Sequence, residues 1–188
     1  MKTYTIIAGV NGVGKSSLVG VLKAERNDLG HIIDVDKIAV IGKLNEVDAG
    51  RVGLDRIGSS LDREISFSQE TTLSGHRTEK TVKTAKKKGY TIRLFYIGLN
   101  TPEESLKRIK NRVDRGGHNI DPRDVKRRFR ERFDSLKKIL PYCDEAYLYD
   151  NENGFVEVGE YKNGEVVFKG DYRPKWLHEL VEAVKEFR

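Results

Sequence analysis

The stretch "IIAGVNGVGKSSLV", Ile6 to Val19, decides the fold class of this protein. It contains the spacing Gly-x-x-x-x-Gly-Lys-Ser, which runs from Gly9 to Ser16 and is typical of a phosphate-binding loop. The preceding residues, "TYTIIAG" (3–9), are short, apolar and β-rich and predict a buried strand. The following residues, "GKSSLVGVLKAER" (14–26), predict a helix. The sequence therefore places this loop where a strand passes into a helix, as the motif requires.

The glycines of this loop follow from what phosphate binding requires. Phosphate oxygens need several donors at close range, and successive backbone N–H groups converge only in conformations that glycine tolerates. Lys15 would then reach the β- and γ-phosphates of ATP or GTP, and the Ser16 hydroxyl would bind Mg²⁺. The start of the helix adds partial positive charge. The expected nucleotide-binding residues are Gly9, Asn11, Gly12, Val13, Gly14, Lys15, Ser16 and Ser17.

Strand and helix patterns alternate along most of the chain. We expect strands at 30–36, 65–71, 90–99 and 145–151, largely helical chain at 37–63, and helices at 77–89, 101–113 and 121–141, the last as one long basic amphipathic helix. This alternation predicts an α/β fold, a three-layer sandwich of the P-loop NTPase type around a mostly parallel sheet.

The tail departs from this alternation. "GFVEVGEYKNGEVVFKG" (154–170) is two alternating runs around Asn163-Gly164, the strongest short signal for a β-hairpin, and a closing helix follows. We interpret the hairpin as a decoration of the sheet edge rather than a partner surface. The domain prediction is one kinase-like domain over residues 1–188, with a lid at about 108–128 and the hairpin and helix at 154–188.

Composition narrows the classes of partner and compartment. The chain has 188 residues, a formal net charge of +6 and a pI near 9.3. This charge fits an anionic partner such as a nucleotide, a sugar phosphate or a nucleic acid, and it fits simple solubility equally well. The single cysteine, Cys143, excludes an internal disulfide or a cysteine zinc cluster. No segment has the pattern of a signal peptide or a membrane span, so we expect a cytoplasmic protein without a membrane partner.

Carboxylates and hydroxyls follow two of the predicted strands. Asp34 and Asp36 end the second strand, where the acceptor of a transferred phosphate would bind, and either is a candidate to accept its hydroxyl proton. Capping of the next helix by Asp36 is the structural alternative. In "QETTLSG" (69–75), Glu70 would hold Mg²⁺ through water or act on the acceptor, and Thr72 and Ser74 would donate to it.

Arginines flank a glycine pair in "RIKNRVDRGGHNIDPRDVKRRFRERF" (108–133). Arginines on a lid stabilise the charge of phosphoryl transfer and exclude water, and Arg112, Arg115 and Arg128 are the candidates for this role. His118 is better suited as a loop donor than as a general base. A nucleic-acid stripe on the basic helix is the rival interpretation, although aromatic residues that would stack on bases are sparse there.

Taken together, these segments resemble the zeta-toxin-like family of P-loop kinases, in the compact chromosomal branch once described as predicted ABC-type ATPases. The resemblance covers roughly residues 2–151. Its most specific parts are "ETTLSG", "RVDRGGHNI" and "RRF", and its other parts are "AGVNGVGKSS", "IDVDKIA", "AKKKGYTIRLFYIGL" and "LYDN". The chain departs from the family pattern at Thr71, where the family has glycine, and it is shorter than the well-studied toxins.

The resemblance implies a kinase that transfers the γ-phosphate of ATP or GTP to an alcohol group. Zeta toxins use the 3′-hydroxyl of UDP-N-acetylglucosamine and thereby block cell-wall synthesis, and an antitoxin is their protein partner. Matched residue by residue, it implies Asp36 as the base, Glu70 and Thr72 at the acceptor, and Arg112 or Arg115 with Arg128 on the lid. Two other functions stay open: a nucleic-acid end kinase or nucleic-acid-dependent ATPase, and a nucleotide-dependent switch that binds another protein through the hairpin.

Overall fold

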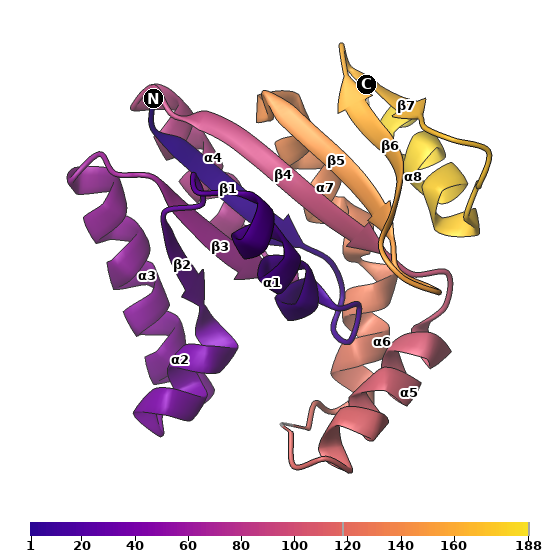
Figure 1. Cartoon of the computed structure of the whole chain (residues 1–188), viewed down its shortest axis with the longest axis horizontal. Helices are drawn as coiled ribbons and strands as arrows, with labels where there is room; N and C mark the ends of the chain where they lie inside the picture. Colours follow the sequence, from indigo (N-terminus) through magenta and orange to yellow (C-terminus); the bar gives the residue numbers. More distant parts are fainter. Residues whose placement is uncertain (118, 188) are drawn as a thin grey trace.

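The computed structural model describes residues 1–117 and 119–187. Its core is a seven-stranded sheet in the order β2-β3-β1-β4-β5-β6-β7 (Figure 1). The strands from β2 through β5 are parallel, and β6 and β7 continue the sheet antiparallel. This arrangement confirms the predicted α/β class. The strands are β1 (Thr3–Ala8), β2 (His31–Asp34), β3 (Phe67–Thr71), β4 (Thr91–Gly98), β5 (Glu145–Asp150), β6 (Val156–Lys162) and β7 (Glu165–Phe168).

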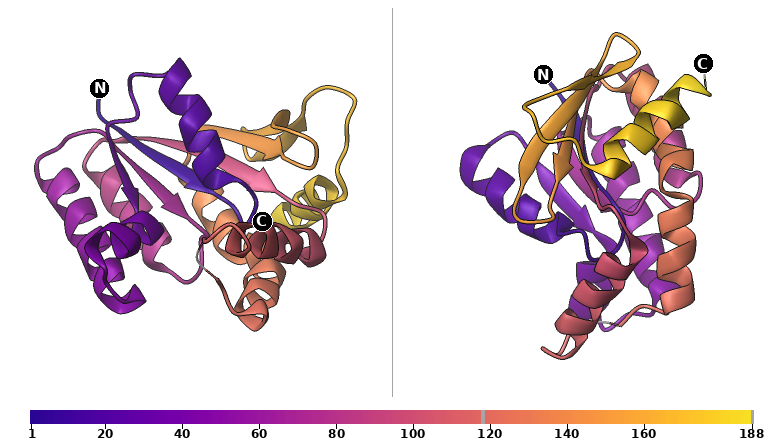
Figure 2. Two further views of the ribbon diagram at one scale, coloured as in Figure 1. Left: turned by 60° about the horizontal axis from the view of Figure 1, so that its bottom comes forward. Right: turned by 90° about the vertical axis from the view of Figure 1, so that its right-hand side faces the viewer.

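Helices cover the two faces of the sheet unequally (Figure 2). α1 (Lys15–Glu25) packs Leu18 and Leu22 against Phe95 on one face. The other face packs against α3 (Glu46–Asp62), α4 (Arg77–Lys87), α7 (Arg132–Ile139) and α8 (Lys175–Lys185). Three more helices complete the described chain: α2 (Val35–Gly42), α5 (Pro102–Val113) and α6 (Pro122–Arg130). None of the helices in the described ranges is long and apolar enough to cross a bilayer.

The prediction of one helix over 121–141 is wrong, because the chain breaks at Glu131 between α6 and α7. Arg132 explains the break. Its guanidinium donates to the Phe129 carbonyl at 2.7 Å, an acceptor that a continuous helix would use, and it also pairs with Glu179 of α8. The same guanidinium lies 4.1 Å and 4.4 Å from the ring centres of Phe129 and Phe133. A contact with a distant helix therefore ends α6.

The predicted hairpin and closing helix are confirmed. Asn163 and Gly164 both have positive φ, 54° and 84°, as a two-residue hairpin turn of the favoured hand requires. α8 is fixed by Trp176, which is fully buried and donates its indole N–H to Asp150 at 2.7 Å. A Cβ on Gly98 would lie 2.1 Å from the indole ring, so only glycine fits at the end of β4.

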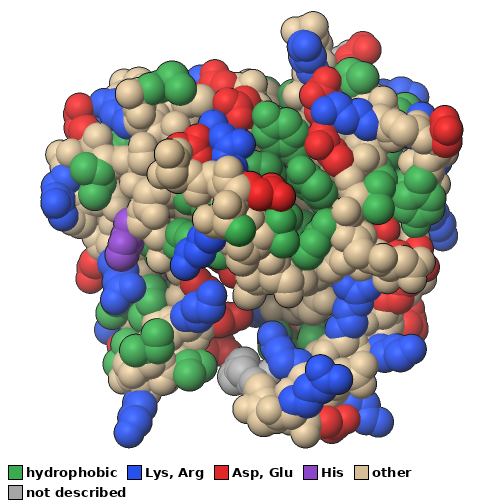
Figure 3. All heavy atoms as spheres, in the orientation of Figure 1, with side chains coloured by type: hydrophobic (Ala, Val, Ile, Leu, Met, Phe, Trp, Pro, Cys, Tyr) green, Lys and Arg blue, Asp and Glu red, His purple; other side chains and the backbone are tan. Residues whose placement is uncertain are grey.

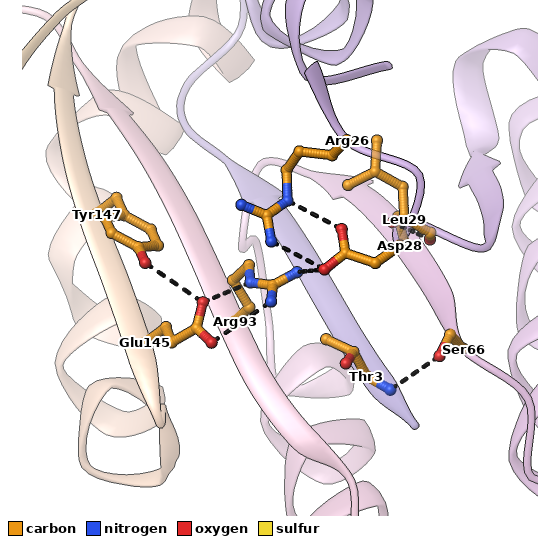
Figure 4. Close-up of polar contacts among 9 residues, drawn as sticks. Thr3, Arg26, Asp28, Leu29, Ser66, Arg93, Glu145 and Tyr147 are labelled. Carbon is orange, nitrogen blue, oxygen red and sulfur yellow. Dashed lines mark hydrogen bonds and ion pairs between the residues drawn. The ribbon is translucent and has the colours of Figure 1, made fainter. Parts of the chain in front are cut away.

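A buried arginine of β4 links this strand to β5 and to the connection between α1 and β2 (Figure 4). Arg93 of β4 is 4% exposed and pairs with Asp28 in the α1–β2 connection at 2.9 Å and with Glu145 of β5 at 2.5 Å. Arg26 closes the cluster with a second pair to Asp28 at 2.8 Å. A buried guanidinium needs such partners, because an unpaired buried charge costs several kcal/mol. The cluster therefore holds the α1–β2 connection, β4 and β5 in register.

The stability of the protein should depend on Asp28 in acid. The hydrogen bond from Arg26, followed by Arg93, holds the pKa of Asp28 well below its ordinary value. A depressed carboxyl pKa stabilises the fold above the unfolded-state pKa, about 3.9, and that stability is lost as the pH falls toward the folded-state pKa. Because Asp28 is partly exposed, we expect Asp28→Asn to lower the free energy of unfolding at pH 7 by only about 1 kcal/mol.

Urea denaturation of both proteins at several pH values measures this effect. The gap in the free energy of unfolding between wild type and Asp28→Asn should narrow progressively as the pH falls below about 5 toward the depressed folded-state pKa. Asp55→Asn, at an exposed position of α3, is the matched control and should change stability little at any of these pH values. A gap that stays constant with pH would contradict the role given to the Asp28 charge.

Candidate functional site

The predicted phosphate-binding loop joins β1 to α1 at the carboxyl edge of the sheet. Gly9, Gly12 and Gly14 have φ values of 148°, 74° and 100°, so each uses the conformation for which glycine was expected. Gly14 is the N-terminal flanking residue of α1, and no side chain caps the helix. The first N–H groups of α1 therefore remain available to an anion, as the motif predicts.

Residues of β4, of α5 and of the chain just after β5 hold the phosphate-binding loop in place. Asn151, just after β5, donates its side-chain amide to the Val13 carbonyl at 2.8 Å. Ser105 of α5 donates its hydroxyl to the Asn11 carbonyl. A Cβ on Gly9 would lie 2.4 Å from the backbone carbonyl oxygen of Ile97 at β4. The concave loop is therefore fixed by the packing around it.

Lys15 lies inside the loop with only 9% of its surface exposed. Its ammonium donates to the Gly9 and Val10 carbonyls at 3.0 Å and 3.1 Å. Burial lowers its pKa, and Arg112 lowers it further, while the carboxylates of Glu70, Asp36 and Asp34 oppose the shift. Four charged side chains therefore act electrostatically on the ammonium of Lys15.

Ser16 and Glu70 form the second contact at this edge. The Ser16 hydroxyl lies 3.1 Å from both carboxylate oxygens of Glu70, the second-last residue of β3. Burial raises the pKa of Glu70, and the neighbouring Asp34 charge adds to this, whereas Lys15 and the Ser16 hydrogen bond lower it. A hydroxyl and a carboxylate side by side are oxygen donors of the kind that Mg²⁺ prefers. Ser17, the next residue, is exposed.

The two aspartates at the end of β2 differ in position from the prediction. They were expected on one extended segment, and capping by Asp36 was the structural alternative, but α2 begins at Val35. Asp34 is therefore the N-cap, 6% exposed, and its carboxylate accepts from the Lys37 N–H at 3.1 Å. Asp36 sits in the first turn of α2 and is exposed, close enough to Lys15 to affect its pKa. Of the two, only Asp36 is open to a substrate.

Thr72 and Ser74 lie in the loop between β3 and α4, with their hydroxyl oxygens 3.0 Å apart. They open onto a cavity of about 470 Å³ between this loop, the α6–α7 junction and the chain after α8. Its volume is that of a small-molecule site. The cavity is lined by Thr72, Leu73, Ser74, Gly75, His76, Arg128, Glu131, Asp134, Ser135, Lys137, Lys138 and Phe187.

The three predicted lid arginines differ in their contacts with the phosphate-binding loop. Arg128 of α6 donates to the Asn11 side chain at 3.0 Å, which brings it to the phosphate-binding loop. Arg112 of α5 is exposed, and its charge contributes to the lowered pKa of Lys15. Arg115 is exposed, and among the described residues its side chain makes no hydrogen bond or ion pair. His118 lies outside the described residues.

Positive charge is concentrated on the arm that carries these arginines. Residues 102–138 hold 13 of the 35 Lys and Arg residues and 7 of the 29 Asp and Glu residues. This segment alone therefore carries +6, the formal net charge of the whole chain. Figure 3 shows the molecule hollowed between the α2–α3 arm and the α5–α6 arm, with charged side chains at the margins of the hollow. The excess of basic residues therefore lies in residues 102–138, on one side of the site.

Sequence reasoning missed several residues that build the site. Asn151 could have been found, because it ends a parallel strand and the carboxyl ends of parallel strands share one edge. The Asn11–Arg128 contact joins residues 117 positions apart, and no local sequence pattern predicts it. Lys138 and Phe187 reach the cavity only because α7 and α8 pack on the same face of the sheet.

A family model described as zeta toxin matches residues 42–160, more than half of the chain. The protein belongs to the zeta toxin family. The match begins after the phosphate-binding loop, so the loop is evidence of nucleotide binding that is independent of the family model. By family and fold, this zeta toxin family member is a nucleotide-binding P-loop kinase, as the resemblance implied.

One relative in sequence and two solved structures are similar to this chain. An uncharacterized protein of Haemophilus influenzae is 38% identical over 126 residues, which cover 64% of this chain and 88% of that protein. A structure of the PezAT chromosomal toxin–antitoxin system of Streptococcus pneumoniae has a TM-score of 0.64 at 17% identity, over 99% of this chain and 85% of that one. A structure of AvrRxo1-ORF1:-ORF2 with ATP has a TM-score of 0.62 at 15% identity, over 100% and 76%. At these identities the two structures show the fold.

Gly14 should be indispensable to the loop. Its φ of 100° and a Cβ position 2.5 Å from the Asn151 amide nitrogen leave no room for a side chain. We expect Gly14→Ala to weaken ATP binding at least ~10-fold and to lower stability by about 1–3 kcal/mol. Calorimetric titration with ATP and thermal unfolding measure the two effects.

Gly20→Ala is the control for this variant, because Gly20 lies within α1 and nothing approaches its Cβ position within 4 Å. Alanine there should raise stability by about 0.5–1 kcal/mol and leave ATP affinity unchanged. Unchanged ATP affinity in Gly14→Ala would show that the loop does not bind the phosphates.

Proposed function

We propose that this protein is an ATP- or GTP-dependent, Mg²⁺-dependent kinase of the zeta toxin type that phosphorylates a hydroxyl of a small molecule. The observation that carries the proposal is the arrangement at the open edge of the sheet, where the Ser16 hydroxyl contacts Glu70 and the charges of Glu70 and Asp36 both act on the buried Lys15. The loop N–H groups and Lys15 bind the β- and γ-phosphates, and α1 adds its N-terminal partial charge.

Asp36 is the proposed base. It is an exposed carboxylate whose charge acts on Lys15, whereas Asp34 is buried and engaged as the N-cap of α2. The acceptor oxygen forms a bond to the γ-phosphorus while the bond from that phosphorus to the β-bridging oxygen breaks, and Asp36 takes the hydroxyl proton. The products are ADP or GDP and a phosphate monoester. Arg128, anchored by Asn11, and Arg112 balance the charge that spreads over the transferred group. Arg115 remains a candidate from the sequence.

The side chains at this edge fit Mg²⁺. Ser16 and Glu70 would hold it, and together with nucleotide phosphates they provide the few oxygen ligands that Mg²⁺ takes from proteins in such sites. No group of three or more His, Cys, Asp or Glu residues suited to a metal occurs in the described ranges. When bound, Mg²⁺ would neutralise phosphate charge.

The acceptor is proposed to bind beside Thr72 and Ser74, in the cavity that also reaches Arg128. UDP-N-acetylglucosamine is the first acceptor to examine, because family membership supports it. An antitoxin protein is the proposed partner, supported by the likeness to the PezAT toxin–antitoxin system. We place the reaction in the cytoplasm, where ATP and sugar nucleotides occur together.

Asp36→Asn should abolish phosphoryl transfer, because the amide cannot accept the hydroxyl proton. We expect at least a ~100-fold loss of kcat with ATP affinity nearly unchanged. Initial rates with labelled ATP and calorimetric titration of ATP measure the two quantities.

Asp34→Asn is the matched comparison, because asparagine also caps helices and loses the same charge two residues away. It should keep most of the activity. Full turnover in Asp36→Asn, or loss of turnover in Asp34→Asn alone, would remove Asp36 from the role of base.

The substrate class is tested by incubating the protein with γ-labelled ATP, Mg²⁺ and one acceptor at a time. The panel contains UDP-N-acetylglucosamine, nucleosides, free sugars and oligonucleotides with a free 5′-hydroxyl. Label on a small molecule is expected. Label on the oligonucleotide alone would favour the nucleic-acid end kinase, for which the +6 charge of residues 102–138 is the supporting observation.

A further inference from the structure

We infer that one face of the sheet at β5, β6 and β7, the face on the side of α1, is a docking surface for a cationic segment of a partner protein. This β5–β7 face consists of Tyr147, Tyr149, Phe155, Glu157, Glu160 and Val167. The inference goes beyond the proposed kinase function, because the face shares no residue with the phosphate-binding loop or the acceptor cavity. It holds or fails whether or not the protein transfers phosphate.

Helices leave this part of the sheet uncovered on one side. A largely parallel sheet is usually covered by helices on both faces. On one face, Leu148 and Val158 pack in a cluster with residues of α7 and α8. On the other face, α1 packs on Phe95 of β4, and Figures 1 and 2 show none of the described helices over β5, β6 and β7 on that side. The β5–β7 face therefore has no covering layer within the described chain.

Aromatic rings line the uncovered side of β5. Tyr147 stacks on Phe95 with ring centres 5.2 Å apart, and the Tyr149 ring centre lies 6.3 Å from that of the same phenylalanine. Both tyrosines are only half-buried. Val167 of the edge strand β7 is 43% exposed, and Figure 3 shows hydrophobic side chains gathered over β5. Rings held rigidly on a strand are typical anchors of protein interfaces.

Carboxylates lie opposite both tyrosines across the β5–β6 ladder. Glu160 is in register with Tyr147, and Glu157 is in register with Tyr149. Because directly opposite residues of neighbouring strands point to the same face, each ring has a carboxylate as its neighbour. Residues 145–169 contain six Asp and Glu residues and two Lys residues, a formal charge of −4 in a chain of net charge +6. This acidic charge is opposite to what a nucleic acid requires and complementary to a cationic partner.

One cation of the chain already uses this face. The Lys169 ammonium lies 2.6 Å from Glu157, 3.4 Å from Glu160 and 5.9 Å from the centre of the Tyr147 ring. Two carboxylates share this single ammonium, so the group keeps a formal charge of −1. A ring beside a carboxylate attracts cations, and a guanidinium suits it best because it stacks on the ring and bonds to the carboxylate. The contacts of Lys169 therefore show which chemistry the face binds.

The extent of the apolar surface indicates a protein segment as the occupant. A small ammonium ion would meet the carboxylates and leave most of the aromatic surface exposed. The apolar residues continue from the two tyrosines to Val167 at the sheet edge and to Phe155, whose ring lies 3.4 Å from the Cβ position of Gly14. A segment that combines Arg or Lys with apolar residues would cover both the rings and the charges.

Calorimetric titration with three synthetic peptides of equal length tests the inference. The cationic probe contains three repeats of Arg-Leu-Gly with both termini blocked, and its two analogues carry Gln or Glu in place of Arg. The cationic peptide should bind ~10-fold or more tightly than the Gln analogue, and the Glu analogue should not bind. Raising the NaCl concentration from about 20 mM to about 500 mM should reduce this preference, because salt screens exposed charges.

Glu160→Gln removes the excess negative charge and leaves the Glu157–Lys169 pair in place, so it should reduce the preference to less than ~3-fold. Tyr149→Leu should weaken binding ~3-fold or more, and Tyr149→Phe should preserve it because the ring is retained. Glu103→Gln, at an exposed position of α5, is the matched charge control and should leave the preference unchanged. Thermal unfolding verifies that each variant is folded.

Lys169→Gln should give a gain of binding, which misfolding cannot imitate. The substitution removes the ammonium that competes with the peptide for the two carboxylates and the Tyr147 ring. The cationic peptide should therefore bind this variant ~3-fold or more tightly than the wild type. A purely structural role of Lys169 predicts no such gain.

Equal binding of the cationic and Gln peptides would overturn the inference, as would an undiminished preference in Glu160→Gln or the absence of a gain in Lys169→Gln. Two further results would reject a partner protein as the occupant. Spermidine, a polyamine of similar charge, binding as tightly as the cationic peptide would assign the face to a small ammonium ligand. Salt-dependent self-association of the protein in place of peptide binding would assign the face to a second copy of this chain.

Discussion

The backbone of the loop between β1 and α1 is the constraint on which the rest of the structure depends. Its glycines hold conformations closed to other residues, and the space around them is filled by the ends of β4 and β5 and by α5. The loop can keep this shape only if these elements meet at the same edge of the sheet. The parallel order of the strands provides that meeting, and it also brings Glu70 to Ser16.

Much of the fold could be predicted from the sequence because its signals are local. The loop spacing, the strand–helix alternation and Asn163-Gly164 each depend on a few neighbouring residues. The break at Glu131 could not be predicted, because its cause is a contact between Arg132 and Glu179, 47 positions away. The start of α2 was misplaced since Asp34 and Asp36 are equally good capping residues and only the packing decides between them.

The residues of the candidate site could be predicted from the sequence to a similar extent. Lys15 and Ser16 come from one motif, and Glu70 and Asp36 follow strands whose ends must share the sheet edge. The arginines were harder, because helix periodicity does not reveal which of many basic residues turns toward the loop. Only the folded chain distinguishes Arg128, which touches Asn11, from Arg115. The cavity wall combines three distant segments, so no single stretch of the sequence predicts which residues line it.

Trp176 has a consequence for how this protein can be studied. It is the single tryptophan of the chain, fully buried against Gly98 and hydrogen-bonded to Asp150. The residue after Asp150 is Asn151, whose amide holds the Val13 carbonyl of the nucleotide loop. The residue that bonds to the indole and the residue that bonds to the loop are therefore adjacent in the chain. Its intrinsic emission provides an optical probe of that loop, without any label and without a background from other indoles.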